Sequence, residues 1–338
     1  MPKSVWLSAH LFYYKDLSAL LTNCIQPVVT ECRARHLIDA YFFIRYWQGG
    51  PHARLRLLPS TEDTAQVIQA ILAQQARRFF EADPSSISID TQIYDTLTEH
   101  LSQVEYGEDL RVPLQAANSL QYIPYQPEYE HYGGPVAMPY IEIFFMHSSD
   151  VALDLLTIGL NKKQRTGQAV SMLLLAMAQF AQNLDELVAL CDDHLHTWHA
   201  LPASLREQLD TRFGQRYQTQ RSQLQQLVTG LLDVAWGKSS EQLPAPLARW
   251  LSASRDLSRT LQQLADSGEL QTNAPSGQLE PRMAILFRCL HMHNNRLGIL
   301  MLEEFYVLFL LRQALADLAG RNGISAQESD RSFVEGVH

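Results

Sequence analysis

The sequence predicts an α+β fold, with a mixed β-sheet in the N-terminal half and a mainly helical C-terminal half. Residues 5–14 are rich in β-branched and aromatic types, and residues 41–58 indicate two strands around a Gly-Gly-Pro turn. From about residue 165 the chain changes to long Leu-, Ala- and Gln-rich segments with helical spacing. We therefore expect a mixed α/β part over 1–160, a helical part over 161–320 and a frayed polar tail over 321–338.

The N-terminal part is expected to alternate helices with strands. Asp16 can cap a helix over 16–40, which Pro27 should break or split. Asp63 lies at the start of an amphipathic helix over 61–80. The remaining expected elements are a strand over 87–94, a turn over 128–135 and a helix over 137–156.

The C-terminal part is expected to be a series of helices. Pro244, Pro246 and Pro275 interrupt the segment 237–280, which we expect to lie at the surface. No internal repeat is visible. The segments with helical spacing are 165–190, 200–236 and 282–320.

Composition limits the possible classes of function. The formal net charge of the 338 residues is −9, which argues against an extended nucleic-acid surface but allows a local basic site. The four cysteines form no C-x-x-C pair and no metal-ligand spacing, so we expect reduced thiols, a cytoplasmic location and no cofactor or metal. No signal peptide and no apolar run of transmembrane length is present, so no membrane association is expected.

The segment "FIRYWQGGPHARLRLLP" (43–59) carries much positive charge for an acidic chain. Strand alternation puts His52, Arg54 and Arg56 on one face, and Arg45 lies on the preceding strand. Such side chains beside a buried apolar face are suited to binding an anion. The alternative is a solvated outer face of an edge strand, where basic residues oppose aggregation.

The segment "HMHNNR" (291–296) gathers polar residues between apolar flanks. On a helix, His291 and Asn295 lie one turn apart on one face, and Arg296 follows. Burying such groups without partners costs free energy. The segment therefore indicates either a functional site or a satisfied core histidine beside a helix break.

Two other histidine-bearing segments also allow a simple structural interpretation. In "PEYEHYGGP", Glu128 and His131 precede a Gly-Gly turn that permits a close backbone approach, and the alternative is a surface turn. In "HLHTWH", His194, His196 and His199 have no carboxylate or cysteine at ligand spacing. A cluster at a helix end or in a loop is favoured there over a metal site.

Four motifs in this order resemble the thiopeptide-type bacteriocin biosynthesis family: "WLSAHLFY", "FFIRYWQGGPHARLRL", "EYEHYGGP" and "HMHNNRLGI". This family is a stand-alone relative of the C-terminal glutamate-elimination domain of lanthipeptide dehydratases, and it includes the thiopeptide pyridine synthases. The resemblance covers nearly the whole chain. The chain is too short for the large glutamyl-transfer domain of a full dehydratase, so the resemblance implies a separate module.

The resemblance implies roles for individual residues. Arg54 and Arg56 match the family's H-x-R-x-R, where Arg56 would hold glutamate or the developing enolate. His291 matches the general acid/base. Glu128 matches the family's acid, whereas His131 stands where the family has an arginine implicated in elimination. We expect a pocket with the catalytic residues His291, Arg56, Arg54 and His131 and the substrate-binding residues Arg45, His52, Glu128, Asn295 and Arg296.

Three functions remain open at this stage. The first is elimination of glutamate from glutamylated Ser or Thr of a ribosomally made precursor peptide, in partnership with a separate tRNA-dependent glutamyl transferase. The second is a formal [4+2] pyridine synthesis that joins two dehydroalanines and releases the leader peptide. The third is a non-catalytic module that binds the leader peptide. The expected partner is the precursor peptide, without direct nucleic-acid contact, and a homodimer is left open.

Overall fold

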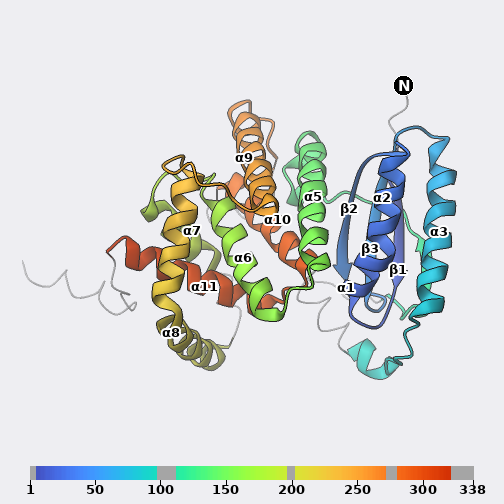
Figure 1. Cartoon of the computed structure of the whole chain (residues 1–338), viewed down its shortest axis with the longest axis horizontal. Helices are drawn as coiled ribbons and strands as arrows, with labels where there is room; N and C mark the ends of the chain where they lie inside the picture. The colour runs from blue at the N-terminus through green and yellow to red at the C-terminus, as the bar shows by residue number, and fades with distance from the viewer. Residues whose placement is uncertain (1–4, 97–111, 196–201, 272–279, 321–338) are drawn as a thin grey trace, which may run out of the picture. The chain divides into compact units, whose positions relative to one another are not determined.

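The computed structural model describes residues 5–96, 112–195, 202–271 and 280–320 and confirms the α+β class (Figure 1). The chain divides into two compact units. We call them the sheet unit and the helical unit. The sheet unit comprises the described residues of Met1–Asn161, Asp266–Asn273 and Arg288–Ile299, and the helical unit comprises those of Lys162–Ala265, Ala274–Phe287 and Leu300–His338.

The sheet unit is built on four antiparallel strands in the order β2-β3-β1-β4. The sheet is thus antiparallel rather than mixed. On one face, the side chains of Ala9, Leu55 and Phe43 lie in register across three strands and are fully buried. The strands are β1 (Leu7–Phe12), β2 (Ile38–Tyr46), β3 (His52–Pro59) and β4 (Ser119–Tyr122).

Two strand predictions were wrong. The segment 87–94 is not a strand, because residues 91–96 are helical and the chain before them is irregular. Its buried Tyr94 instead donates its hydroxyl to the Val112 carbonyl in an adjoining segment. The edge strand β4 was not predicted, because four residues are too few to give a clear period-2 pattern.

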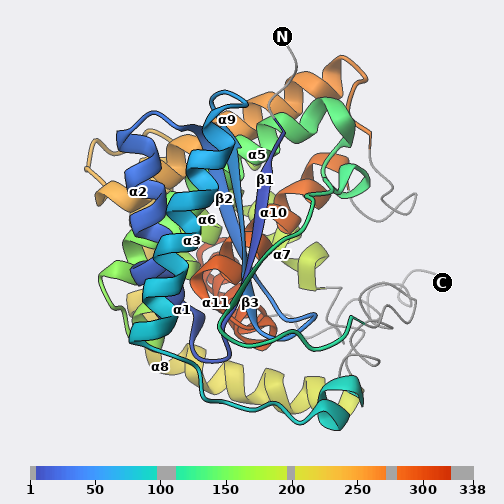
Figure 2. The same ribbon diagram turned by 90° about the vertical axis from the view of Figure 1, so that its right-hand side faces the viewer.

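Three helical segments and the helix α3 cover the apolar face of the sheet, and Figure 2 shows α2 and α3 side by side there. Pro27 does not break the first helix, because it lies in the first turn of α2, where a missing N–H is tolerated, directly after a π-helical turn. The helix ends at Ala34, well before the predicted residue 40. These elements are α1 (Leu17–Leu20), η1 (Leu21–Ile25), α2 (Gln26–Ala34) and α3 (Thr64–Ala82).

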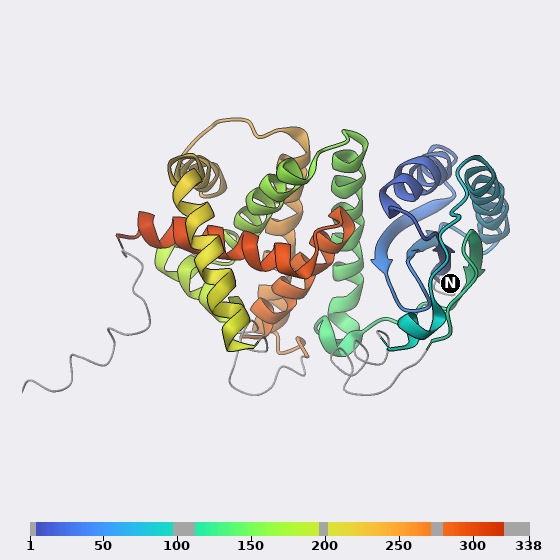
Figure 3. The ribbon, with the colours of Figure 1, turned by 90° about the horizontal axis from the view of Figure 1, so that it is seen from below.

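Helix α5 (Gly134–Thr157) packs against the opposite face beside β2, as Figures 1 and 3 both show. It follows the short 3₁₀ turn η2 (Tyr129–His131). Gly133 has a φ of 90° at the helix N-cap, a left-handed conformation that favours glycine. The predicted turn and the helix after it are therefore both present.

The helical unit contains the long C-terminal helices. Helix α11 packs on α6, α7 and α8, and fully buried Trp250 donates its indole N–H to the Met172 carbonyl at 2.7 Å. Helix α9 occupies much of the segment that was expected to be surface chain. The helices are α6 (Lys162–Met177), α7 (Leu184–Leu195), α8 (Ala203–Ala235), α9 (Ala245–Asp266), α10 (Pro281–Leu297) and α11 (Met301–Leu318). The second half of α10, from Arg288 onward, belongs to the sheet unit.

None of the helices in the described residues has the length and apolar character that crossing a membrane requires. All four cysteines are unpaired thiols in buried positions. The predicted tail over 321–338 lies outside the described residues.

Candidate active site

The strand register gathers basic side chains on the sheet face that α5 covers. Arg54 lies opposite His10 of β1, and Arg56 lies opposite Phe42 of β2. The ring of Phe42 meets Phe145 of α5 at 5.5 Å between centroids, which identifies the face. Arg56 is 7% exposed, and its strand β3 is an internal strand. This burial excludes a solvated edge-strand face for Arg56.

His52 orients Arg54 through a chain of hydrogen bonds. The Nδ1 atom of His52 lies 2.8 Å from the Gly50 carbonyl, and Arg54 Nε donates to His52 Nε2 at 3.2 Å. This assigns the proton to Nδ1, because Nε2 must accept. The guanidinium of Arg54 also lies 3.4 Å from the ring centroid of Tyr46. The turn permits this arrangement because Gly50 has a φ of 101° and a Cβ there would collide with Tyr14.

Burial and cationic neighbours keep the imidazoles of this face neutral. Burial, helped by Arg54 and Arg56, lowers the pKa of His52 to about 4 against the opposing pull of the Gly50 carbonyl. The same causes lower the pKa of His10 to about 2. The two rings stack with centroids 5.0 Å apart. Neutral imidazoles avoid adding charge next to two arginines.

Arg56 is a buried cation with unused hydrogen-bond donors. Its guanidinium lies 4.6 Å from the ring centroid of Tyr125 and 5.4 Å from that of Phe42. Its Nε and Nη1 atoms are buried and have no hydrogen-bond partner. Within the described part of the chain, no carboxylate oxygen comes within ion-pair distance of it. Burial lowers the pKa of Arg56 to about 10.

Arg56 interacts electrostatically with residues of three distant segments. The charges of Glu128, before the Gly-Gly turn, and of Glu142, on α5, raise its pKa. Arg56 in turn lowers the pKa of Arg296 on α10. The hairpin, the "PEYEHYGGP" segment and the "HMHNNR" segment therefore lie within electrostatic range of one another. No spacing rule in the sequence could have established this.

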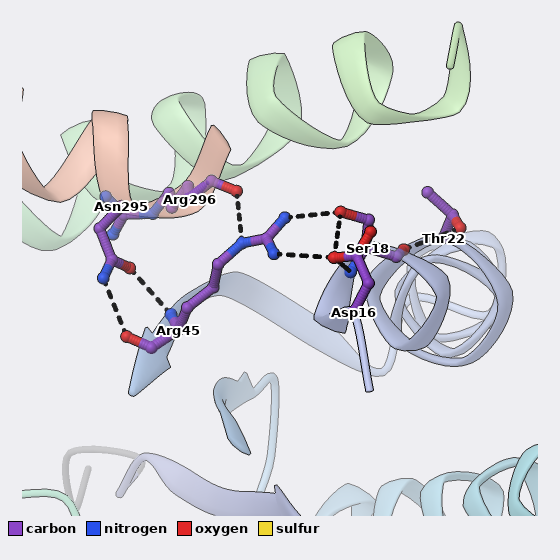
Figure 4. Close-up of polar contacts among 6 residues, drawn as sticks. All are labelled: Asp16, Ser18, Thr22, Arg45, Asn295 and Arg296. Carbon is purple, nitrogen blue, oxygen red and sulfur yellow. Dashed lines mark hydrogen bonds and ion pairs between the residues drawn. The ribbon is translucent and has the colours of Figure 1, made fainter. Parts of the chain in front are cut away.

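Asn295 and Arg45 join α10 to the edge of the sheet (Figure 4). The Asn295 side chain accepts from the Arg45 backbone N–H at 2.8 Å and donates to the Arg45 carbonyl at 2.9 Å. The Arg45 guanidinium donates to the Arg296 carbonyl and to the Ser18 hydroxyl, and pairs with Asp16 at 3.6 Å. These contacts satisfy backbone groups at the edge of β2. The side-chain donors of Arg45 and Asn295, both predicted to bind substrate, are therefore used within the fold.

Arg296 is fully buried in a network of hydroxyl groups. Its Nε donates to Ser149 Oγ at 3.1 Å and its Nη1 to Ser148 Oγ at 3.3 Å. His293 Nδ1 lies 2.9 Å from the same Ser148 oxygen, and burial lowers its pKa to about 3. The guanidinium also lies 4.7 Å from the centroid of Phe145. Arg296 and Arg56 are thus connected through aromatic rings of one layer.

The side chains of His131 and His291 are exposed, and each lies close in sequence to one contact between α10 and the segment before α5. The His131 carbonyl accepts from Arg288 Nη1 at 2.8 Å, and His291 lies one turn further along α10. Buried Tyr132, which follows His131, packs edge-on against Phe145 at 5.2 Å between ring centroids. The Arg288 side chain therefore joins α10 to the segment that carries His131, whereas the alignment of the two predicted catalytic histidines with each other and with Arg56 stays a prediction.

Residues 6–315 match the family model described as "Lantibiotic biosynthesis dehydratase C-term". The chain belongs to this family. That places it among the proteins that mature ribosomally made peptides. The epidermin biosynthesis protein EpiB of Staphylococcus epidermidis is 22% identical over 152 residues, which is 45% of this chain but only 12% of EpiB. The chain thus aligns with a small part of that relative's length.

Solved structures share the fold of this lantibiotic dehydratase C-terminal family member. The pyridine synthase TbtD from thiomuracin biosynthesis gives a TM-score of 0.79 at 18% identity and covers 94% of this chain and 99% of its own. TsrL gives 0.67 at 17% identity over 93% and 95%. The tRNA-dependent lantibiotic dehydratase MibB from Microbispora sp. 107891 gives 0.59 at 21% identity over 95% of this chain and 29% of its own.

Several members of the site in this family member were not predicted from the sequence. His10 could have been found by pairing the predicted strand 5–14 with the hairpin. Tyr46, Tyr125 and Glu142 carried no such signal. An irregular segment brings Tyr125 to the sheet, and α5 brings Glu142.

A metal site at the "HLHTWH" segment was the disfavoured alternative in the sequence, and the structure describes only one of its histidines. The described residues contain no group of three His, Cys, Asp or Glu side chains that could hold a metal ion. His194 stacks on Phe287 with centroids 4.2 Å apart, and His196 and His199 lie outside the described residues.

The buried imidazoles predict a pH dependence of stability. His52 has a folded pKa of about 4, below the ordinary 6.5, so the unfolded chain binds more protons between these values and stability falls as pH drops through this window. From pH 8 to pH 5 the loss from His52 alone should be about 2 kcal/mol. Urea titrations should show this loss in the wild type and a flatter profile in His52→Gln. An identical pH profile in the variant would contradict the assignment.

Proposed function

We propose that this protein eliminates glutamate from glutamylated Ser or Thr residues of a precursor peptide, leaving dehydroalanine or dehydrobutyrine. The observation that carries the proposal is Arg56, a buried guanidinium whose Nε and Nη1 atoms have no partner. A planar guanidinium with vacant donors binds a carboxylate in two-point fashion. Glutamate supplies carboxylates both as a leaving group and on its side chain.

The chemistry needs a base, a stabilised anion and a leaving group. His291 would take the α-proton of the esterified residue. The negative charge would develop on the neighbouring amide oxygen, where an arginine stabilises it. The carbon–oxygen bond to the glutamyl ester then breaks, and glutamate leaves as a carboxylate held by Arg56. The site residues supply these functions without electron transfer, and the glutamyl ester itself would come from a separate tRNA-dependent transferase.

His131 favours a second candidate, the formal [4+2] pyridine synthesis. The family has an arginine at this position, and a histidine can be neutral where arginine cannot. A cycloaddition needs proton transfer for amide tautomerisation but less fixed positive charge. The fold likeness to a thiomuracin pyridine synthase makes this the natural rival.

The substrate separates the two candidates. We expect purified protein to release glutamate from a glutamylated precursor, seen as the corresponding mass loss, and to leave a fully dehydrated precursor unchanged. The variant His131→Arg should eliminate faster, because it adds a fixed cation for the leaving carboxylate.

The opposite outcome would support pyridine synthesis in place of glutamate elimination. In that case only the dehydrated peptide reacts, giving a pyridine-bearing core and free leader peptide. A protein that binds the leader but converts neither substrate would be a binding module instead.

A further inference from the structure

Glu142 is a carboxylate of the basic face that the sequence motifs leave unexplained. It lies on α5 and accepts a hydrogen bond from the indole N–H of Trp6 at 3.2 Å. It also takes part in hydrogen bonding with the phenol of Tyr125, whose pKa is raised by burial and further by the charge of Glu142. Burial raises the pKa of Glu142, and Tyr125, Trp6 and Arg56 oppose this shift.

The two groups that bind Glu142 belong to an aromatic cluster that lies beside Arg56. The rings of Trp6, Phe42 and Tyr125 make an aromatic cluster, with centroid distances of 5.0 Å, 5.7 Å and 6.2 Å between its pairs. The Arg56 guanidinium lies over two of these rings. The polar ends of Trp6 and Tyr125 thus point to Glu142, while the ring of Tyr125, together with that of Phe42, packs against Arg56.

Glu142 attracts the Arg56 cation without pairing directly with its guanidinium. The charge of Glu142 raises the pKa of Arg56, so it stabilises the cation. A carboxylate directly paired with the guanidinium would occupy the donors that an anionic ligand needs. Instead, Glu142 acts through two neutral aromatic groups, and Arg56 Nε and Nη1 remain without partners.

We propose that Glu142 is the positioning residue of the Arg56 site, which fixes the Trp6–Phe42–Tyr125 cluster beside the guanidinium and so keeps its two unused donors for a carboxylate ligand. The proposal rests on the proposed function for the identity of the ligand alone. It assigns the effect to the two hydrogen bonds that Glu142 accepts. A neutral acceptor of the same shape should therefore preserve the site.

Binding of glutarate, a five-carbon dicarboxylate, to the whole protein tests this without a peptide substrate. Calorimetry should show about tenfold weaker binding in Glu142→Leu, which removes the acceptor. Glu142→Gln retains an acceptor oxygen and removes a charge that repels the ligand, so its affinity should equal or exceed that of the wild type. Trp6→Phe keeps an aromatic ring and loses the indole donor, so it should weaken binding about threefold. This variant also tests the inference if Glu142→Leu does not fold.

Turnover distinguishes positioning from a purely structural role. With glutamylated peptide, Glu142→Leu should raise KM more than it lowers kcat, because a smaller folded fraction changes kcat alone. Glu142→Gln should restore the wild-type KM. Equal weakening in Glu142→Gln and Glu142→Leu, or none in Glu142→Leu and Trp6→Phe, would overturn the inference.

The failure of this inference is distinguishable from failure of the proposed function. A wild-type protein that binds no glutarate and spares glutamylated peptide would refute the elimination proposal. Tight glutarate binding that is indifferent to Glu142 and Trp6 would refute only the positioning role.

Discussion

Replacing Arg56 with Met should lower kcat/KM for glutamate elimination about 10³-fold, a loss of about 4 kcal/mol of transition-state stabilisation. The reason is that Arg56 is a buried guanidinium with two unused donors, and Met fills a similar volume without charge. Arg56→Lys should recover a part of the activity only, because a point charge lacks the planar fork that matches a carboxylate. Single-turnover assays with glutamylated peptide measure this.

The same substitution should leave the free energy of unfolding unchanged or raise it by about 1–3 kcal/mol. A desolvated cation with two unsatisfied donors costs free energy, and removing it also removes that cost. Urea unfolding of the unliganded protein gives the value independently of any assay.

Arg54→Met is the matched control for this stability effect. Arg54 is hydrogen-bonded to His52 and stacked on Tyr46, so its loss should destabilise the protein. A gain in Arg54→Met, or a marked loss in Arg56→Met, would show that the two arginines have been assigned the wrong roles.

The contrast between these arginines marks what the sequence could predict. The period-2 alternation of β3 placed His52, Arg54 and Arg56 on one face, because strand geometry alone determines that pattern. Which of them lacks partners depends on the residues that other elements supply. Tyr125 and Glu142 come from an irregular segment and from α5, and no local pattern predicts that they meet at Arg56.

Local patterns also gave predictions that tertiary contacts overrode. The segment 87–94 alternates like a strand, but residues 91–96 are helical and Tyr94 bonds to a neighbouring segment. Polar Asn295 was expected to bind substrate, whereas its amide binds the Arg45 backbone at the edge of β2. A polar side chain in an apolar sequence indicates a partner, but not whether that partner is a ligand or the chain itself.

Replacing His291 with Ala should lower turnover of glutamylated peptide about 10²–10⁴-fold, the usual contribution of a positioned acid or base, and glutamylated peptide should accumulate. Its side chain is exposed on α10, so the free energy of unfolding should change by less than about 0.5 kcal/mol. Mass spectrometry of the peptide and urea unfolding of the protein give the two values.

His293, two residues further along the same helix, is the matched control. Its ring is 1% exposed and bonded to Ser148, and burial lowers its pKa to about 3. His293→Ala should therefore destabilise the protein, by about 2–3 kcal/mol from the lost packing and the unpaired hydroxyl, while the folded fraction keeps its turnover. Elimination that persists in His291→Ala but fails in folded His293→Ala would move the base from the exposed histidine to the buried one, and with it the site of proton transfer from the surface of α10 to the Ser148–Arg296 network.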